Sequence, residues 1–120
     1  MKSSRLLSIA FLVAVVGCGK TLPELDGIST EAWKSDHSAC HAVRQTMISA
    51  LETQRHKLTS LSEMEVVKLL GRPDQNELYK RNEKFYHYLV EGGPGCTDHK
   101  TRRLTIRFNA VGLSKEAIIE

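Results

Sequence analysis

The sequence predicts an α+β domain, a two-layer sandwich in which two helices pack on one face of a three- to four-stranded antiparallel sheet. Apolar residues recur at helical spacing between Asp36 and about Lys57, and a short second helix follows between Ser62 and Gly71. After Asp74 the apolar period becomes alternating, as in strands with one buried face. Because the helices precede the run of strands, we expect them to lie together on one face of the sheet.

Residues 1–17 have the composition of a bacterial export signal. Lys2 and Arg5 form a positive head, and the apolar run over residues 6–16 is too short to span a bilayer as a helix. The run ends in Val15–Cys18, which resembles the lipobox recognised by lipoprotein signal peptidases. The resemblance implies cleavage before Cys18 and lipidation of its thiol. An ordinary secretory signal with a chance cysteine is the alternative.

The mature chain would consist of a tether and one domain. Residues 18–32 contain Gly and Pro without apolar periodicity and are expected to be a flexible tether, so that 33–120 is the single α+β domain. Two of the 17 basic residues lie in the signal, which leaves 15 basic against 14 acidic side chains. The mature chain therefore lacks the large excess of positive charge that is typical of nucleic-acid-binding domains.

The predicted helices differ in how clearly their ends are marked. In the first, Asp36 is a plausible N-cap, and Val43 and Met47 lie on the apolar face. In the second, Ser62 and Glu65 have the spacing of a capping box, and Gly71 marks the end. Trp33, just before the first helix, is expected to pack onto the domain.

Three or four strands are expected after these helices. The first begins at Leu78–Tyr79, and the second runs from Lys84 to Glu91 with Phe85, His87 and Leu89 on one face. The third, from Arg103 to Asn109, alternates with Leu104, Ile106 and Phe108 directed inward. Residues 113–119, after the turn at Gly112, are the candidate for a fourth strand.

About half of the mature chain, from residue 60 to about 113, resembles the BamE/SmpA/OmlA family of small outer-membrane lipoproteins. The matching features are the capped helix Ser62–Gly71 with Pro73 beyond it, the aromatic strand Phe85–Tyr88, and the strand Leu104–Phe108 followed by Gly112. The resemblance implies the fold and a membrane location. None of the family's lipid- or partner-contacting residues can be matched, and a widely shared fold does not fix a function.

Cysteine usage predicts a disulfide. Lipidation of Cys18 leaves the pair Cys40 and Cys96, which an oxidising compartment would join. The bond would be worth roughly 3 to 4 kcal/mol in the chain-entropy model. A zinc site made by Cys40, His41, Cys96 and His99 is the alternative, although adjacent helical residues point about 100° apart.

No motif indicates catalysis, so we predict that the chain is not an enzyme. Gly-x-Ser-x-Gly, His-Glu-x-x-His and paired-carboxylate signatures are missing from the sequence. No cofactor is expected apart from the covalent lipid, and no small-molecule substrate is indicated. The candidate interaction surface consists of Tyr79, Tyr86, Tyr88, Arg103 and Arg107. It requires that the three tyrosines lie beside the arginines on the outer face of the sheet, as a Tyr/Arg patch of the kind enriched at protein interfaces.

Three function hypotheses remain. The leading one is a membrane-anchored cell-envelope lipoprotein that acts as a structural or protein-interaction module, as an accessory of outer-membrane assembly, with another envelope protein as its partner. The alternative is an inhibitor-like module that binds an envelope or secreted hydrolase through its sheet face, and the third is a small zinc or redox protein. Gly19 stands where an inner-membrane retention signal of enteric bacteria has Asp, which favours the periplasmic face of the outer membrane.

Overall fold

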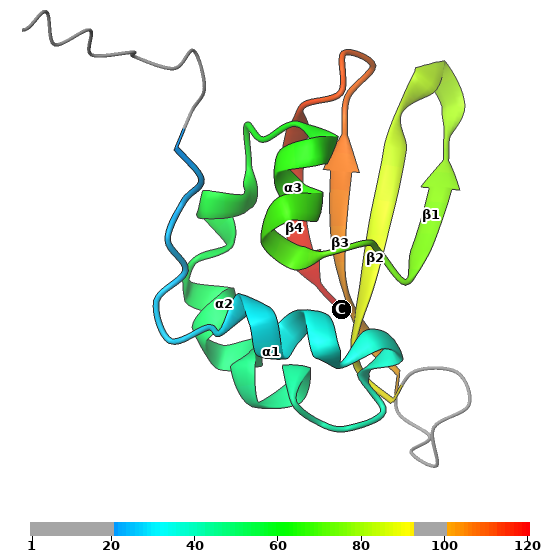
Figure 1. The fold of residues 1–120 in the computed structure, drawn as a ribbon. Coiled ribbons are helices and arrows are strands. Elements are labelled where there is room, and N and C mark those ends of the chain that lie inside the picture. Colours follow the sequence, from blue (N-terminus) through cyan, green and yellow to red (C-terminus); the bar gives the residue numbers. More distant parts are fainter. Residues whose placement is uncertain (1–20, 93–100) are drawn as a thin grey trace, which may run out of the picture.

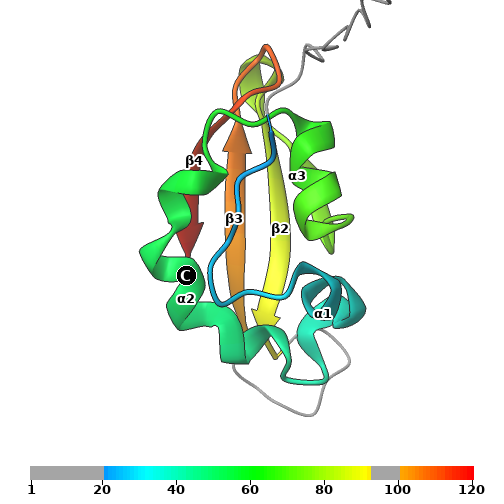
Figure 2. The ribbon, with the colours of Figure 1, turned by 60° about the vertical axis from the view of Figure 1, so that its left-hand side comes forward.

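The computed structural model describes residues 21–92 and 101–120, and it confirms the α+β two-layer fold. An open antiparallel sheet has the strand order β1-β2-β3-β4, and the helices cover one of its faces (Figures 1 and 2). The strands are β1 Gln75–Leu78, β2 Lys84–Glu91, β3 Arg102–Phe108 and β4 Ser114–Ile119. The α-helices are α1 Thr30–Ser35, α2 Ile48–Thr53 and α3 Glu63–Leu70, with 3-10 turns at His37–Ala39, Arg44–Met47, Arg55–Leu58 and Lys80–Asn82.

The second predicted helix is confirmed as α3. The Ser62 hydroxyl accepts a hydrogen bond from the Glu65 N–H at 3.1 Å, and the Glu65 carboxylate accepts one from the Ser62 N–H at 2.9 Å. This reciprocal pair satisfies two of the free N–H groups at the helix start. The helix ends where predicted, because Gly71 takes a φ of +79°, which disfavours side chains with a Cβ.

The register of the central strands decides which side chains form the core. Tyr86 pairs with Ile106 and Tyr88 with Leu104, so these four side chains share the face that the helices cover. The predicted span of β2 is confirmed, and β3 and β4 deviate by a residue at their ends. The first strand was wrongly placed: it ends at Leu78 instead of beginning there, because all four residues of this edge strand are exposed and carry no alternating pattern.

The predicted single helix between Asp36 and Lys57 is wrong. The buried Asp36 carboxylate accepts hydrogen bonds from the backbone N–H groups of His41, Val43 and Arg44 at 2.8, 2.9 and 3.0 Å. These bonds hold residues 36–43 in a loop that contains the short 3-10 turn His37–Ala39, and a longer run of helical turns begins only at Arg44. The Asp36 side chain thus binds the backbone N–H groups that a helix would use, and the continuous helix predicted from the apolar spacing does not form.

A buried ion pair ties this loop to the sheet. The side chains of Arg44 and Asp74 are 1% and 2% exposed, and their Nη1 and Oδ2 atoms lie 2.6 Å apart. Arg44 also donates to the carbonyl oxygens of Trp33 and Leu89, at 2.9 and 3.0 Å, and its guanidinium lies 4.8 Å from the centre of the Trp33 ring. The Asp74 carboxylate accepts from the N–H groups of Ser38 and Leu89 as well.

The folded domain also begins earlier in the sequence than the expected end of the tether at residue 32. Leu25 is part of the hydrophobic core, and Asp26 exchanges two backbone hydrogen bonds with the Gln54 side chain, at 2.6 and 2.7 Å. Trp33 is fully buried as predicted, within a helix that Ser29 caps. Folded structure therefore begins before the expected domain start.

Removing either end signal of α3 should destabilise the domain. Ser62→Ala loses the capping hydrogen bond and should cost about 1 kcal/mol. Gly71→Val should cost more, because a β-branched residue is strained at a φ of +79° and its Cβ would lie 3.0 Å from Lys34 Cγ. Urea denaturation measures both, with the exposed Ser49→Ala as control. Unchanged stability in both variants would contradict the role given to these caps.

Replacing the buried cation should have a larger effect. Arg44→Met leaves the Asp74 carboxylate buried without its counter-ion, which should cost about 3 to 5 kcal/mol. The matched control is Arg102→Met, which removes a half-exposed arginine that lies 3.8 Å from Glu91 and should cost less than about 1 kcal/mol. Equal losses of unfolding free energy in the two variants would show that the buried pair has no special importance.

Candidate functional site

The candidate site is the face of the sheet that the helices leave uncovered. The side chains of Phe85, His87 and Leu89 point to this face from β2, opposite the core tyrosines of the same strand. The facing residues of β3 are Arg107, Thr105 and Arg103. We call this surface the outer face.

A chain of hydrogen bonds crosses three strands at the centre of the outer face. The Nδ1 atom of His87 lies 2.9 Å from the Thr105 hydroxyl, and its Nε2 atom lies 3.0 Å from a carboxylate oxygen of Glu77. The Phe85 ring lies parallel to the imidazole, with centroids 6.1 Å apart. No short sequence motif indicates these hydrogen bonds, because Glu77, His87 and Thr105 lie on different strands.

The order hydroxyl, imidazole, carboxylate is the order found in nucleophilic hydrolases. Here the hydroxyl and the imidazole are both buried, since Thr105 is 6% and His87 4% exposed. Thr105 also lies in the middle of β3, a central strand paired on both sides. The backbone N–H groups around Thr105 are thus used in strand pairing, whereas acyl transfer needs N–H groups that are free to bind an oxyanion. The arrangement acts as a cross-strand link.

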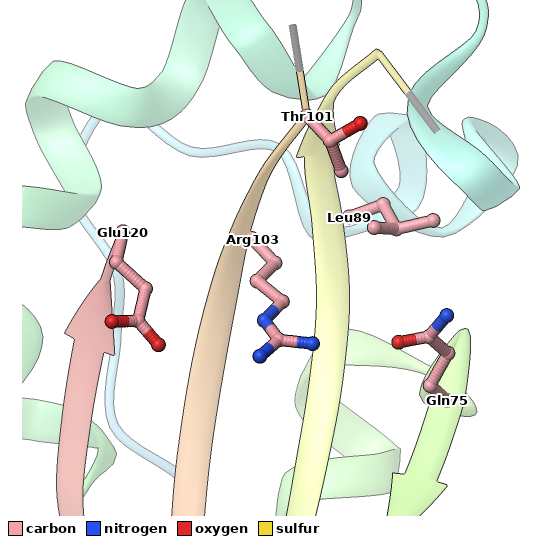
Figure 3. Close-up of a pocket in the computed structure, with 5 residues that line it drawn as sticks. All are labelled: Gln75, Leu89, Thr101, Arg103 and Glu120. Carbon is pink, nitrogen blue, oxygen red and sulfur yellow. The ribbon is translucent and has the colours of Figure 1, made fainter. Parts of the chain in front are cut away.

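Two adjoining hollows lie on this face, one beside the link and one lined by its three members. One, of about 350 Å³, is lined by Gln75, Leu89, Thr101, Arg103 and Glu120, and Figure 3 shows the Arg103 side chain between Gln75 of β1 and Glu120 beyond β4. The second has the same volume and shares Arg103 and Glu120. Its other lining residues are Glu77, Tyr79, Phe85, His87, Thr105 and Ile118. Arg103 forms no ion pair with another described residue, so its guanidinium can bind an anionic group.

The predicted interaction surface is wrong in two of its five members. Tyr86 and Tyr88 are 7% and 0% exposed and face the helices, because their strand partners Ile106 and Leu104 belong to the core. Arg103 and Arg107 do lie on the outer face, and Arg107 is paired with Glu83 at 3.0 Å. Tyr79 is exposed and stacks edge-on against Phe85.

The two buried tyrosines are structural. The Tyr86 hydroxyl donates to a Glu63 carboxylate oxygen at 2.7 Å, and burial together with this carboxylate raises the pKa of Tyr86 to about 12. The Tyr88 hydroxyl donates to the carbonyl oxygen of Gly71 at 2.7 Å, and burial raises the pKa of Tyr88 further. Both phenols therefore join β2 to the ends of α3.

The cysteine and histidine predictions are tested only in part. Cys40 is disulfide-bonded, so its thiolate is not available for the alternative zinc set. The expected partner Cys96, like Cys18 and His99, lies outside the described residues, so the pairing stays a prediction. Within the described ranges no cluster of three or more His, Cys, Asp or Glu side chains could hold a metal ion.

No protein-family model, curated protein or solved structure matches this chain. In the part of the chain that the structure describes, no helix is long and apolar enough to cross a membrane.

The buried tyrosines should make the fold sensitive to alkali. In the unfolded chain tyrosine ionises near pH 10, whereas Tyr86 keeps its proton in the folded state to about 12. Ionisation then favours the unfolded state, so stability present below about pH 10 should be lost as the pH rises towards 12. The free energy of unfolding in urea, measured across this range, should fall less steeply for Tyr86→Phe. The exposed Tyr79→Phe is the control, and equal slopes for Tyr86→Phe and the parent would contradict the assignment.

Proposed function

We propose that this chain is a lipid-anchored protein of the cell envelope and that its domain is a structural or protein-interaction module. The observation that carries the proposal is the sequence Val15–Cys18 at the end of a short apolar run with a positive head. Acyl chains on Cys18 would provide membrane affinity by burying methylene groups. The outer membrane, on its periplasmic face, is the proposed location.

The uncovered outer face supports the interaction role. Its hollows are open and contain an arginine without an ion pair among the described residues, flanked by Leu89 and Phe85. Arginine and aromatic residues are enriched at protein interfaces. A function as an accessory of outer-membrane assembly is proposed on the resemblance of residues 60–113 to the BamE/SmpA/OmlA family.

The same hollows favour a second candidate, an inhibitor-like module that binds a hydrolase through the outer face. Crosslinking the lipidated protein in membranes and purifying it separates the two. A stoichiometric complex with membrane proteins supports the first function, and a captured hydrolase with lowered activity supports the second. Arg103→Ala should weaken the capture in either case.

Lipidation is tested by replacing its acceptor. Cys18→Ser should accumulate as an uncleaved or soluble form that takes up no labelled fatty acid and no longer partitions into detergent. Cys40→Ala is the matched control: it should remain membrane-attached while its unfolding free energy falls by a few kcal/mol, since a disulfide is lost. Detergent partitioning of Cys18→Ser at the parental level would refute the lipoprotein proposal.

A further inference from the structure

The exposed large apolar side chains gather at one end of the molecule. Among the described residues they are Met64, Leu78, Tyr79, Val111 and Leu113, with exposed fractions of 68, 70, 52, 78 and 36%. Met64 lies in the first turn of α3, Leu78 and Tyr79 lead into the turn between β1 and β2, and the other two lie in the turn between β3 and β4. We call these five residues the apolar tip.

Direct contacts join these three segments. Ser62, at the start of α3, pairs with Leu113 through a β-bridge. The neighbouring Glu63 carboxylate lies 3.2 Å from the Lys84 ammonium group, and Lys84 is the strand partner of Leu78. Figure 1 shows the two hairpin turns and the start of α3 at the same end of the sheet.

Two basic side chains at this end have no acidic partner among the described residues. The acidic side chains beside the turns are engaged, Glu63 with Lys84 and Glu83 with Arg107. Lys80 and Arg81, at the turn between β1 and β2, are exposed and form no ion pair within the described ranges. Aliphatic, tyrosine and basic side chains together are typical of surfaces that lie in a membrane interface.

The path of the chain places the anchor on the same side. The described chain starts at Thr21 and runs from the end that carries the hairpin turns toward α1 (Figures 1 and 2). Cys18 precedes Thr21 by three residues, which span at most about 11 Å when extended. A lipid on Cys18 would therefore hold the domain close to the bilayer, with this end nearest to it.

We propose that the apolar tip rests in the headgroup region of the membrane to which Cys18 is anchored, with Lys80 and Arg81 directed at lipid phosphates. The proposal rests on the lipidation of Cys18. It orients the domain, because the opposite end and the hollow lined by Gln75, Leu89 and Arg103 then remain in water, accessible to a partner.

The depth of spin labels tests this orientation. The lipidated full-length mature protein, carrying a nitroxide at Leu78→Cys or Val111→Cys, is reconstituted into vesicles of phosphatidylethanolamine and phosphatidylglycerol. The control label is at Gln45→Cys, an exposed residue whose amide lies 3.4 Å from Glu91 at the far end of β2. The ratio of collisions with oxygen to collisions with a water-soluble nickel complex should be several-fold higher at the tip positions than at Gln45.

The outcomes separate this inference from the proposed function. If the protein binds vesicles through Cys18 and the tip labels match the control, the orientation is wrong although the lipoprotein assignment stands. If the tip labels are exposed to water in vesicles and protected only in native membranes, the tip contacts a protein partner, and the proposed orientation is again wrong. If the wild-type chain carries no lipid, the proposed function fails first. A raised ratio at both tip positions that falls in Lys80→Gln/Arg81→Gln supports the proposal.

Discussion

The ion pair between Arg44 and Asp74 fixes the relation between the helical layer and the sheet. Both side chains are almost fully buried, and burying charges costs free energy unless they are paired and hydrogen-bonded. Here the requirement is met by groups from three regions: the Trp33 carbonyl of α1, the Ser38 N–H of the loop, and both backbone groups of Leu89 in β2. The pair is therefore satisfied only when these regions are assembled together. Asp74 also immediately precedes β1, so the same interaction sets where the sheet begins.

The parts of the fold that the sequence predicts well are those governed by local rules. The capping box of Ser62 and Glu65 spans three residues, and alternation along β2 needs only neighbours in sequence. The helix expected after Asp36 does not form, because helical hydrogen bonds compete there with hydrogen bonds to a side chain. The Asp36 carboxylate binds three backbone N–H groups five to eight residues away, and hydrophobic spacing alone contains no information about this bond.

The candidate site was harder to predict because it depends on register. Alternation separates Tyr86 and Tyr88 from Phe85 and His87, but it does not say which set faces the helices. Pairing with Ile106 and Leu104 decides this, and it moves both tyrosines into the core. The link through His87, Thr105 and Glu77 joins three strands, so no short motif could have indicated it.

The arrangement of layers limits where this protein can meet another molecule. The helices cover the inner face, and on the outer face both ring nitrogens of His87 already lie within hydrogen-bond distance of Thr105 and Glu77. The two hollows of the outer face share Arg103, whose guanidinium has no counter-ion among the described residues. A guanidinium without an ion pair can still form charge-assisted hydrogen bonds with an anionic group, whereas that of Arg44 is already bonded to Asp74, Trp33 and Leu89. The two arginines thus differ: Arg44 is used to build the fold, whereas Arg103 is the one that the proposed interaction would use.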